Sequence, residues 1–217
     1  MTKPIIGILG AGKLGTVLAK IAINSGYEVL IAGSGSVEKI ALTIEVLVPG
    51  AEAKVAAEVA EKADIIILAL PLGKYKSVPK EKLANKIVID AMNYWWEVDG
   101  PDNDILKETL SSSEVVAKYL KNSIVVKAFN HMGYHDLEEV IYQEDGQERK
   151  AIAYATDDIG AGNQVAKLIE NFGFDSLNLG ELSRGVILEP GYPPFGANLS
   201  KIDLQKMIET INKDYSK

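Results

Sequence analysis

The chain has 217 residues, of which 47% are hydrophobic and 24% charged, values ordinary for a globular protein with one sizeable core. Its formal net charge of −7 argues against a nucleic-acid or anionic-membrane surface, because both need clustered Lys and Arg. The absence of Cys excludes disulfides and thiolate chemistry, and we find neither a signal-peptide pattern nor an apolar run of membrane-spanning length. We therefore predict a cytoplasmic protein with no nucleic-acid and no membrane partner.

Short β-branched runs alternate with amphipathic stretches in the N-terminal half, which is typical of strands joined by helices. The run Asp64–Pro71 is apolar throughout, which predicts a strand buried on both faces. The other elements predicted before it are, in chain order, strand Ile5–Leu9, a helix from Leu14 to Ala22, strand Glu28–Ala32, helix Ser36–Leu47, strand Glu52–Val55 and a short helix through Lys62.

The same alternation continues to the C-terminus. Ser111 and Glu114 form the pattern of a capping box that opens a helix through Leu120. Asp157 or Asp158 is placed to cap a later helix through Phe172. The remaining predicted elements are strands Lys86–Asn93, Ser123–Asn130, Arg149–Asp157 and Phe174–Leu179, and a terminal helix near Ile202–Ile211.

Strands separated by helices predict an α/β fold with a doubly wound, mostly parallel sheet of the Rossmann type and extra C-terminal strands and helices. We assign residues 1–180 to an NAD(P)-binding domain that includes the additional strands. Residues 181–217 are expected to form a C-terminal loop and helix packed on that same domain. This segment is too short for a separate substrate domain, so we expect an open cleft and a homodimer.

The glycines Gly10, Gly12 and Gly15 form a G-x-G-x-x-G pattern between the first strand and the first helix. In that context, Gly10 makes a tight turn, Gly12 lets a pyrophosphate approach the backbone, and Gly15 allows close packing of helix on sheet. The positive end of the helix favours the phosphate charge. The alternative is a glycine-rich turn that binds no ligand.

The end of the second strand predicts which dinucleotide is bound. NAD sites usually carry an acid there for the ribose 2′-OH, but here Gly33 is followed by Ser34, Gly35 and Ser36. Hydroxyl groups at this position, with Lys39 nearby, suit a 2′-phosphate, so NADP is predicted and NAD is less favoured. In the alternative reading, the serines only form a turn and a helix cap.

Several polar and aromatic residues follow the predicted strands and are candidates for chemistry. Asn93 and Asn130 are placed to orient a nicotinamide amide or a substrate carbonyl, although Asn is also a common turn residue. His131 and Tyr94 are the candidate proton donors, with a purely structural role as the alternative for His131. His131, His135 and Asp136 do not make a convincing metal site, so no metal is predicted.

Two aromatic residues are candidates for covering a flat ligand ring. Trp95 follows a strand beside a second Trp, and the two rings of an extended Trp–Trp pair cannot enter one core. Phe195 lies in a Pro-rich loop that is placed to close the pocket. Core packing or a subunit contact is the alternative for these rings.

With these residues in view, the chain resembles the family of NADP-dependent oxidoreductases named for the deazaflavin coenzyme F420. The similarity rests on the segments ILGAGKLG, AGS after the second strand, DIIILALP, KIVIDAMN, VVKAFNHMG and LEPGYPPFGAN. Members typically carry Ser-Arg after the second strand, and Gly35 stands here in the Arg position. The resemblance implies a pyrophosphate on Gly12, Lys13 and Leu14, a 2′-phosphate on Ser34 and Ser36, a ribose beside Leu70 and Pro71, and a nicotinamide near Ala91, Met92 and Asn93.

We therefore expect an NADP(H)-dependent oxidoreductase that transfers hydride between nicotinamide and a second redox partner, such as a deazaflavin, a flavin or a small substrate. Transfer between two flat rings needs positioning and water exclusion more than an acid or base. Asn93, Trp95, Asn130, His131 and Phe195 are the candidate residues for the second substrate. A carbonyl or imine reductase, which needs a proton donor, and a non-catalytic NADP(H)-binding redox sensor are the alternatives.

Overall fold

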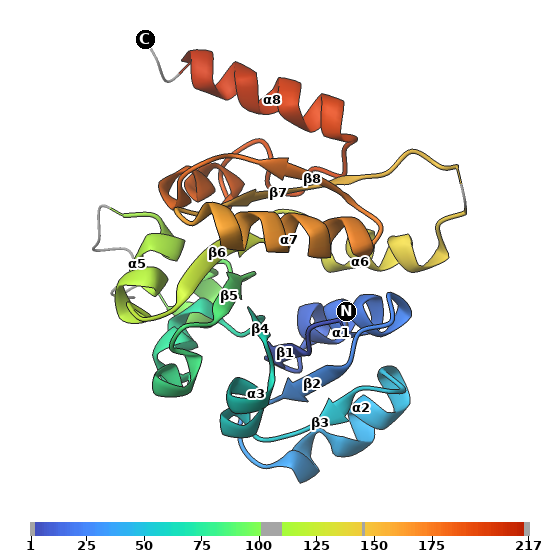
Figure 1. Cartoon of the computed structure of the whole chain (residues 1–217). Coiled ribbons are helices and arrows are strands. Elements are labelled where there is room, and N and C mark those ends of the chain that lie inside the picture. Colours follow the sequence, from blue (N-terminus) through green and yellow to red (C-terminus); the bar gives the residue numbers. More distant parts are fainter. Residues whose placement is uncertain (1–2, 101–109, 145, 215–217) are drawn as a thin grey trace.

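An eight-stranded sheet covered by helices on both faces forms the body of the molecule (Figure 1). The computed structural model describes residues 3–100, 110–144 and 146–214. The strand order is β3-β2-β1-β4-β5-β6-β7-β8. The strands are β1 Ile6–Leu9, β2 Val29–Ala32, β3 Glu52–Ala53, β4 Ile65–Leu68, β5 Ile87–Asp90, β6 Ile124–Ala128, β7 Ala151–Ala155 and β8 Asp175–Asn178.

Strand directions confirm the predicted Rossmann-type fold and add one feature to it. Strands β1 to β6 run parallel to one another. Strand β7 runs antiparallel to β6 and parallel to β8. The sequence pattern did not reveal this reversal, because the apolar pattern of a buried strand carries no direction. The chain leaves β1 toward β2 and β3 and then returns to β4 on the other side of β1. This switch point is where doubly wound sheets bind ligands.

The predicted helices are present with shifted ends, and α4, α6 and the 3₁₀ elements η2, η3, η5 and η6 were not predicted. The predicted helix 36–47 is divided into a 3₁₀ turn and a shorter α-helix. The elements are α1 Lys13–Asn24, η1 Val37–Lys39, α2 Ala41–Leu47, α3 Ala56–Lys62, η2 Leu72–Ser77, η3 Lys80–Leu83, α4 Trp96–Asp99, α5 Ser112–Tyr119, α6 Tyr134–Glu139, η5 Val140–Tyr142, α7 Ile159–Asn171, η6 Leu182–Leu188 and α8 Lys201–Asp214.

Both predicted helix caps are present. The Ser111 hydroxyl accepts a hydrogen bond from the Glu114 N–H while the Glu114 carboxylate accepts from the Ser111 N–H, so the capping box is confirmed. The Asp158 carboxylate, rather than that of Asp157, caps α7 by accepting from the Ala161 N–H. These caps supply partners for N–H groups that a helix leaves unpaired at its start.

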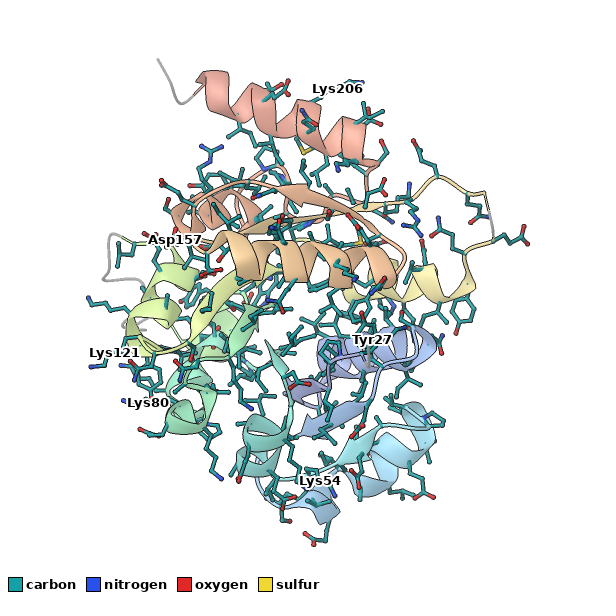
Figure 2. All side chains as sticks on the ribbon, viewed as in Figure 1. Tyr27, Lys54, Lys80, Lys121, Asp157 and Lys206 are labelled. Atoms are coloured by element: carbon teal, nitrogen blue, oxygen red, sulfur yellow. The ribbon has the colours of Figure 1, made fainter. Side chains whose placement is uncertain are left out.

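The core lies on both faces of the sheet. One cluster joins the inner sides of α1, α6 and α7 to the strands, and a second lies under α3, α5, η2 and η3. In the first cluster Tyr27, labelled in Figure 2, meets Phe172 edge-to-face with ring centroids 5.8 Å apart. The C-terminal helix α8 and η6 close a third cluster over β7 and β8. Within the described part of the chain, no helix is long and apolar enough to cross a membrane.

Candidate functional site

The glycine loop brings α1 against the sheet with no side chain in between. Gly10 has φ +123, and a Cβ there would lie 2.1 Å from the Ala69 carbonyl oxygen. A Cβ on Gly15 would lie 1.8 Å from the Gly10 carbonyl oxygen. Both positions therefore require glycine for folding itself, through a left-handed turn and a close approach.

Gly12 is different, because a Cβ there would meet nothing within 4 Å. It is the N-terminal residue before α1, and no side chain caps the helix at this point. The first N–H groups of α1 therefore face open space, where they and the helix dipole favour an anion. Folding does not explain this glycine, whereas a phosphate close to the backbone does.

A pocket of about 520 Å³ lies beside this helix end, at the C-terminal ends of β1, β2 and β4. It includes four residues predicted for cofactor binding, Gly10, Ser34, Leu70 and Pro71. Its lining is Leu9, Gly10, Ala32, Gly33, Ser34, Gly35, Ala56, Leu70, Pro71, Lys74, Ser77 and Val78. The strand order turns at this place, so the pocket fits the adenosine half of a dinucleotide.

The rim of the pocket departs from the prediction at Ser36. Ser36 is not among the residues that line the pocket. Its hydroxyl instead hydrogen-bonds the Glu38 carboxylate and lowers the pKa of that exposed group. Ser36 thus stands at the N-terminal end of η1, where its side chain makes no cap hydrogen bond, and of the two predicted serines only Ser34 lines the pocket.

Two lysines bring positive charge to the pocket. The Lys39 side chain lies over Gly35, with Nζ 3.2 Å from the place that a Gly35 Cβ would take. Lys74 lines the pocket from η2. Sequence reasoning missed Lys74, although the dense lysines after the strand run, at positions 74, 76, 80 and 82, were a visible signal. Among the described residues, no carboxylate pairs with Lys39 or Lys74.

The residues predicted for the nicotinamide lie at the ends of β5 and β6. Asn93 Nδ2 donates to the Asn130 carbonyl oxygen at 2.7 Å, and Asn130 Nδ2 donates to Asn93 Oδ1 at 3.0 Å and to the Leu188 carbonyl oxygen at 2.7 Å. The structure thus joins the two asparagines that the sequence placed on separate strands. The side chains of Ala91 and Met92 are buried, so only their backbone is available to a ligand.

Strained backbone supports the asparagine pair. Phe129, directly before Asn130, has φ +63 although it is a bulky residue, and it is fully buried. Such conformations cost on the order of 1–3 kcal/mol and persist only where the surroundings impose them. Asn130 Oδ1 is also buried with no hydrogen-bond partner among the described residues. The strained Phe129 backbone and the unpaired Asn130 Oδ1 thus lie at the same end of the sheet, which makes this end a candidate for ligand binding.

The structure corrects the assignment of His131 as a proton donor. Its side chain is 1% exposed, and Nε2 accepts a hydrogen bond from the Ala153 N–H at 3.0 Å. Burial lowers its pKa to about 4; the Pro194 carbonyl opposes the shift but makes no regular hydrogen bond with Nδ1. The imidazole is therefore neutral near pH 7 and shielded from any substrate, and its role is structural.

Tyr94 is corrected for a related reason. Its hydroxyl donates to the Gly100 carbonyl oxygen at 2.7 Å, and its ring packs on the core under α3 and α5. The proton is thus already engaged in holding the loop after β5. Among the described residues, no group of three or more His, Cys, Asp or Glu is arranged to hold a metal ion. His135 and Asp136 do not form such a site.

An aromatic pair stands beside the asparagines. Trp95 is 46% exposed and meets the Phe195 ring edge-to-face, with centroids 5.7 Å apart. The Asp99 carboxylate fixes this loop, because it accepts from the Trp95 N–H at 2.9 Å and from the Gly73 N–H at 2.7 Å. The pair presents apolar ring surface next to the end of β5.

The two remaining loop residues have different surroundings. Lys13 Nζ lies 3.2 Å from the Tyr134 hydroxyl and 5.4 Å from the centre of its ring, so the side chain is directed toward α6. Leu14 packs on the core under α1. For both residues, the group that is available to a pyrophosphate at the start of α1 is the backbone N–H.

Comparison with known proteins identifies the N-terminal part of this site. Residues 5–94 match the sequence model of the family described as NADP oxidoreductase, coenzyme F420-dependent. This segment is similar to that family of NADP oxidoreductases. The predicted resemblance is thereby confirmed for the segment that carries the glycine loop, the pocket and the start of the nicotinamide end. A comparison with curated proteins gives no significant match.

Solved structures extend the similarity over most of the chain. A hypothetical protein of Sinorhizobium meliloti, SMa0349, shares 27% identity with a TM-score of 0.79, over 93% of this chain and 96% of that one. A candidate F420-dependent NADP reductase of Arthrobacter sp. FB24 shares 22% identity with a TM-score of 0.72, over 85% and 88% of the two chains. An imine reductase of Myxococcus stipitatus in complex with NADP+ shares 14% identity with a TM-score of 0.59, over 98% of this chain and 64% of that one. The last two likenesses show the fold alone.

Replacing Gly12 by Val tests the phosphate loop. The side chain has room in the free protein, so the variant is expected to fold with an unchanged melting temperature. It should bind NADPH about a hundredfold more weakly, because the side chain takes the place of the pyrophosphate. Calorimetric titration with NADPH and thermal melting measure the two quantities. Gly15→Ala is the contrasting variant, which should lose about 1–3 kcal/mol of stability through overpacking. Full NADPH affinity in Gly12→Val would contradict the assignment.

Acid unfolding tests the structural role of His131. Its pKa in the folded state, about 4, lies below the usual 6.5, so its contribution is complete above pH 6.5 and declines as the pH falls toward 4. Between about pH 7.5 and about pH 5 this side chain should cost the wild type about 2 kcal/mol of stability. Urea unfolding at the two pH values measures the loss of unfolding free energy. This loss should be smaller by that amount in His131→Gln than in the wild type, whereas His135→Gln, which retains His131, should show the wild-type loss. An equal loss in wild type and His131→Gln would refute this role.

Proposed function

We propose that the protein is an NADP(H)-dependent oxidoreductase that passes hydride between the nicotinamide and a second, flat-ringed redox partner of the deazaflavin or flavin type. The observation that carries the proposal is the pocket at the switch point, whose lining contains one lysine, two serines and no acid. The match of residues 5–94 to the family model supports the oxidoreductase class. The open position at Gly12 supports a bound pyrophosphate next to that pocket.

NADP is favoured over NAD by the charge at the pocket rim. A 2′-phosphate carries close to two negative charges near pH 7, so it gains from nearby ammonium groups and loses from carboxylates. Ser34 and Lys74 line the pocket, and Lys39 lies over the lining residue Gly35, so a hydroxyl and two positive charges are near the phosphate. Lys39 lies over Gly35, so it brings a positive charge to the position where the resemblance leads us to expect an arginine.

The other half of the dinucleotide extends across the ends of β4 and β5. Leu70 and Pro71 border the pocket on that side, and Asn93 follows β5. Asn93 is held by Asn130, so its remaining amide N–H is pre-oriented for the nicotinamide carboxamide or a substrate oxygen. A bound nicotinamide would supply the hydride, while these residues orient the ring and exclude water.

A flat-ringed partner fits the site better than a carbonyl or imine. Reduction of a carbonyl or imine needs a proton donor at the reacting atom, and neither of the predicted donors, His131 and Tyr94, is available. Hydride transfer between two rings needs only stacking, and a proton from water balances the charge. Trp95 and Phe195 offer an aromatic surface for that second ring. A redox sensor without turnover, and a homodimer, remain predictions that turnover and sedimentation measurements test.

Cofactor selectivity is tested by neutralising the pocket lysines one at a time. Lys39→Met and Lys74→Met should each weaken NADPH binding about five- to tenfold and leave NADH binding unchanged, because only NADPH carries the 2′-phosphate. Lys76→Met is the matched control, since Lys76 lies over the Tyr75 ring and does not line the pocket. Calorimetric titration at two salt concentrations measures the ratio of NADPH affinity to NADH affinity, which should fall as the salt concentration rises. Equal binding of NADPH and NADH by the wild type would refute the NADP assignment.

The second substrate is tested by turnover across an acceptor panel of coenzyme F420, flavins and small carbonyl and imine compounds. Trp95→Ala should raise the KM for the active ring acceptor about tenfold and leave NADPH affinity unchanged, because one stacking face is lost. Trp96→Ala is the control, since that ring is exposed and makes no ring contact with Phe195 in the described part of the chain. Turnover confined to carbonyl or imine substrates would overturn the proposal.

A further inference from the structure

A buried ion pair lies beneath the nicotinamide end of the site. Asp90 closes β5 and Lys127 lies in β6, and both side chains are 0% exposed. Lys127 Nζ is 3.4 Å from Asp90 Oδ2. Neither residue was singled out in the sequence, where they stand inside the apolar runs KIVIDAMN and SIVVKAFN. Charged groups in such a position are rare unless they are paired.

The pair holds one peptide from both sides. Asp90 Oδ1 accepts a hydrogen bond from the Met92 N–H at 3.0 Å, and Lys127 Nζ donates to the Met92 carbonyl oxygen at 2.6 Å. The residue that follows is Asn93, whose side chain is held in turn by Asn130. The first loop residues after β5 are therefore fixed by two charged groups, whose hydrogen bonds are stronger than those of neutral groups.

Neighbouring elements seal the pair from water. The Ser113 hydroxyl at the start of α5 donates to Asp90 Oδ2 at 2.6 Å. Gly185 of η6 lies so close that a Cβ there would be 3.1 Å from Cβ and Cγ of Lys127. Removing two charges from water is costly, and well-packed apolar side chains often stabilise a core better. Stability alone thus gives no reason for charges here, whereas placement of the loop does.

We propose that Asp90 and Lys127 are positioning residues that hold the backbone of Met92 and Asn93 against the nicotinamide half of the dinucleotide. The inference rests on the proposed function, because it takes NADP(H) as the ligand of the site. It separates the site into two parts: the glycine loop and the pocket lysines hold the adenosine half, and the ion pair serves only the nicotinamide half. The two parts can therefore be tested with two ligands.

The experiment compares NADPH with adenosine 2′,5′-bisphosphate, which has the adenosine half and no nicotinamide. Lys127→Met should weaken NADPH binding about tenfold and leave binding of the bisphosphate unchanged, since the Met92 carbonyl loses its partner. Ser113→Ala, which removes one hydrogen bond to Asp90, should have the same selectivity with a smaller effect of about threefold. Calorimetric titration measures both ligands, and circular dichroism verifies the fold.

Two further variants separate positioning from stability. Lys127→Met leaves Asp90 unpaired, so the double variant Asp90→Asn/Lys127→Met, which has no unpaired charge, should fold better and show the same selective loss. Leu204→Ala in α8 is a destabilising control, because Leu204 is fully buried in the cluster over β7 and β8 and belongs to neither strand that carries the ion pair. It should lower the melting temperature and leave the ratio of the two affinities unchanged.

The outcomes distinguish this inference from the proposed function. Equal weakening of both ligands, or an unchanged ratio in the folded Ser113→Ala and double variants, would show that the pair is only structural. Equal affinity of the wild type for NADPH and the bisphosphate would also overturn the inference, because no nicotinamide contact would exist to be lost. If the wild type bound neither ligand, the proposed function would fail first.

Discussion

The site depends on the contact between the start of α1 and the ends of β1 and β4. This contact is possible because Gly10 and Gly15 have no side chain. A Cβ on Gly10 would overlap a backbone oxygen at a distance of 2.1 Å, and a Cβ on Gly15 would do so at 1.8 Å. The helix consequently begins directly above the turn in strand order. Its unpaired N–H groups and the crevice between the strands then face the same space. The position of the pocket, and of every residue assigned to it, follows from this approach.

The two halves of the site use different physics. The side proposed for the adenosine half is open and carries its charge on exposed lysines, Lys39 and Lys74. Their attraction for a phosphate acts over a short distance in water and weakens as the salt concentration rises. The nicotinamide side is buried, and there the polar groups bond to one another: Asp90 with Lys127, and Asn93 with Asn130. An open charged rim suits capture of a phosphate, whereas a rigid buried network suits the positioning that hydride transfer needs.

Much of the fold was predictable because it depends on local patterns. Continuous apolar runs predicted buried strands, and the capping box at Ser111 was correct in every contact. The antiparallel direction of β7 was not predictable, because it is set by how the chain returns after β6 and not by the strand's own residues. In the site, Gly10 and Gly15 were interpreted correctly from spacing, since both the turn and the close packing depend on the absence of a side chain. His131 was misread, because adjacency to Asn130 in sequence says nothing about which way an imidazole faces in the core.

By itself, the sequence determined the order of strands and helices, the glycine turn before α1 and the absence of an acid after β2, because each is a property of neighbouring residues. The tertiary structure decided what no short segment contains. It placed Lys39 over Gly35 and Lys74 across the pocket, engaged Ser36 with Glu38, buried His131 beside Ala153, and joined Asp90 to Lys127 across two strands. These are contacts between residues far apart along the chain or turned by the backbone, and their energies arise only when packing removes water and brings the groups within a few ångströms.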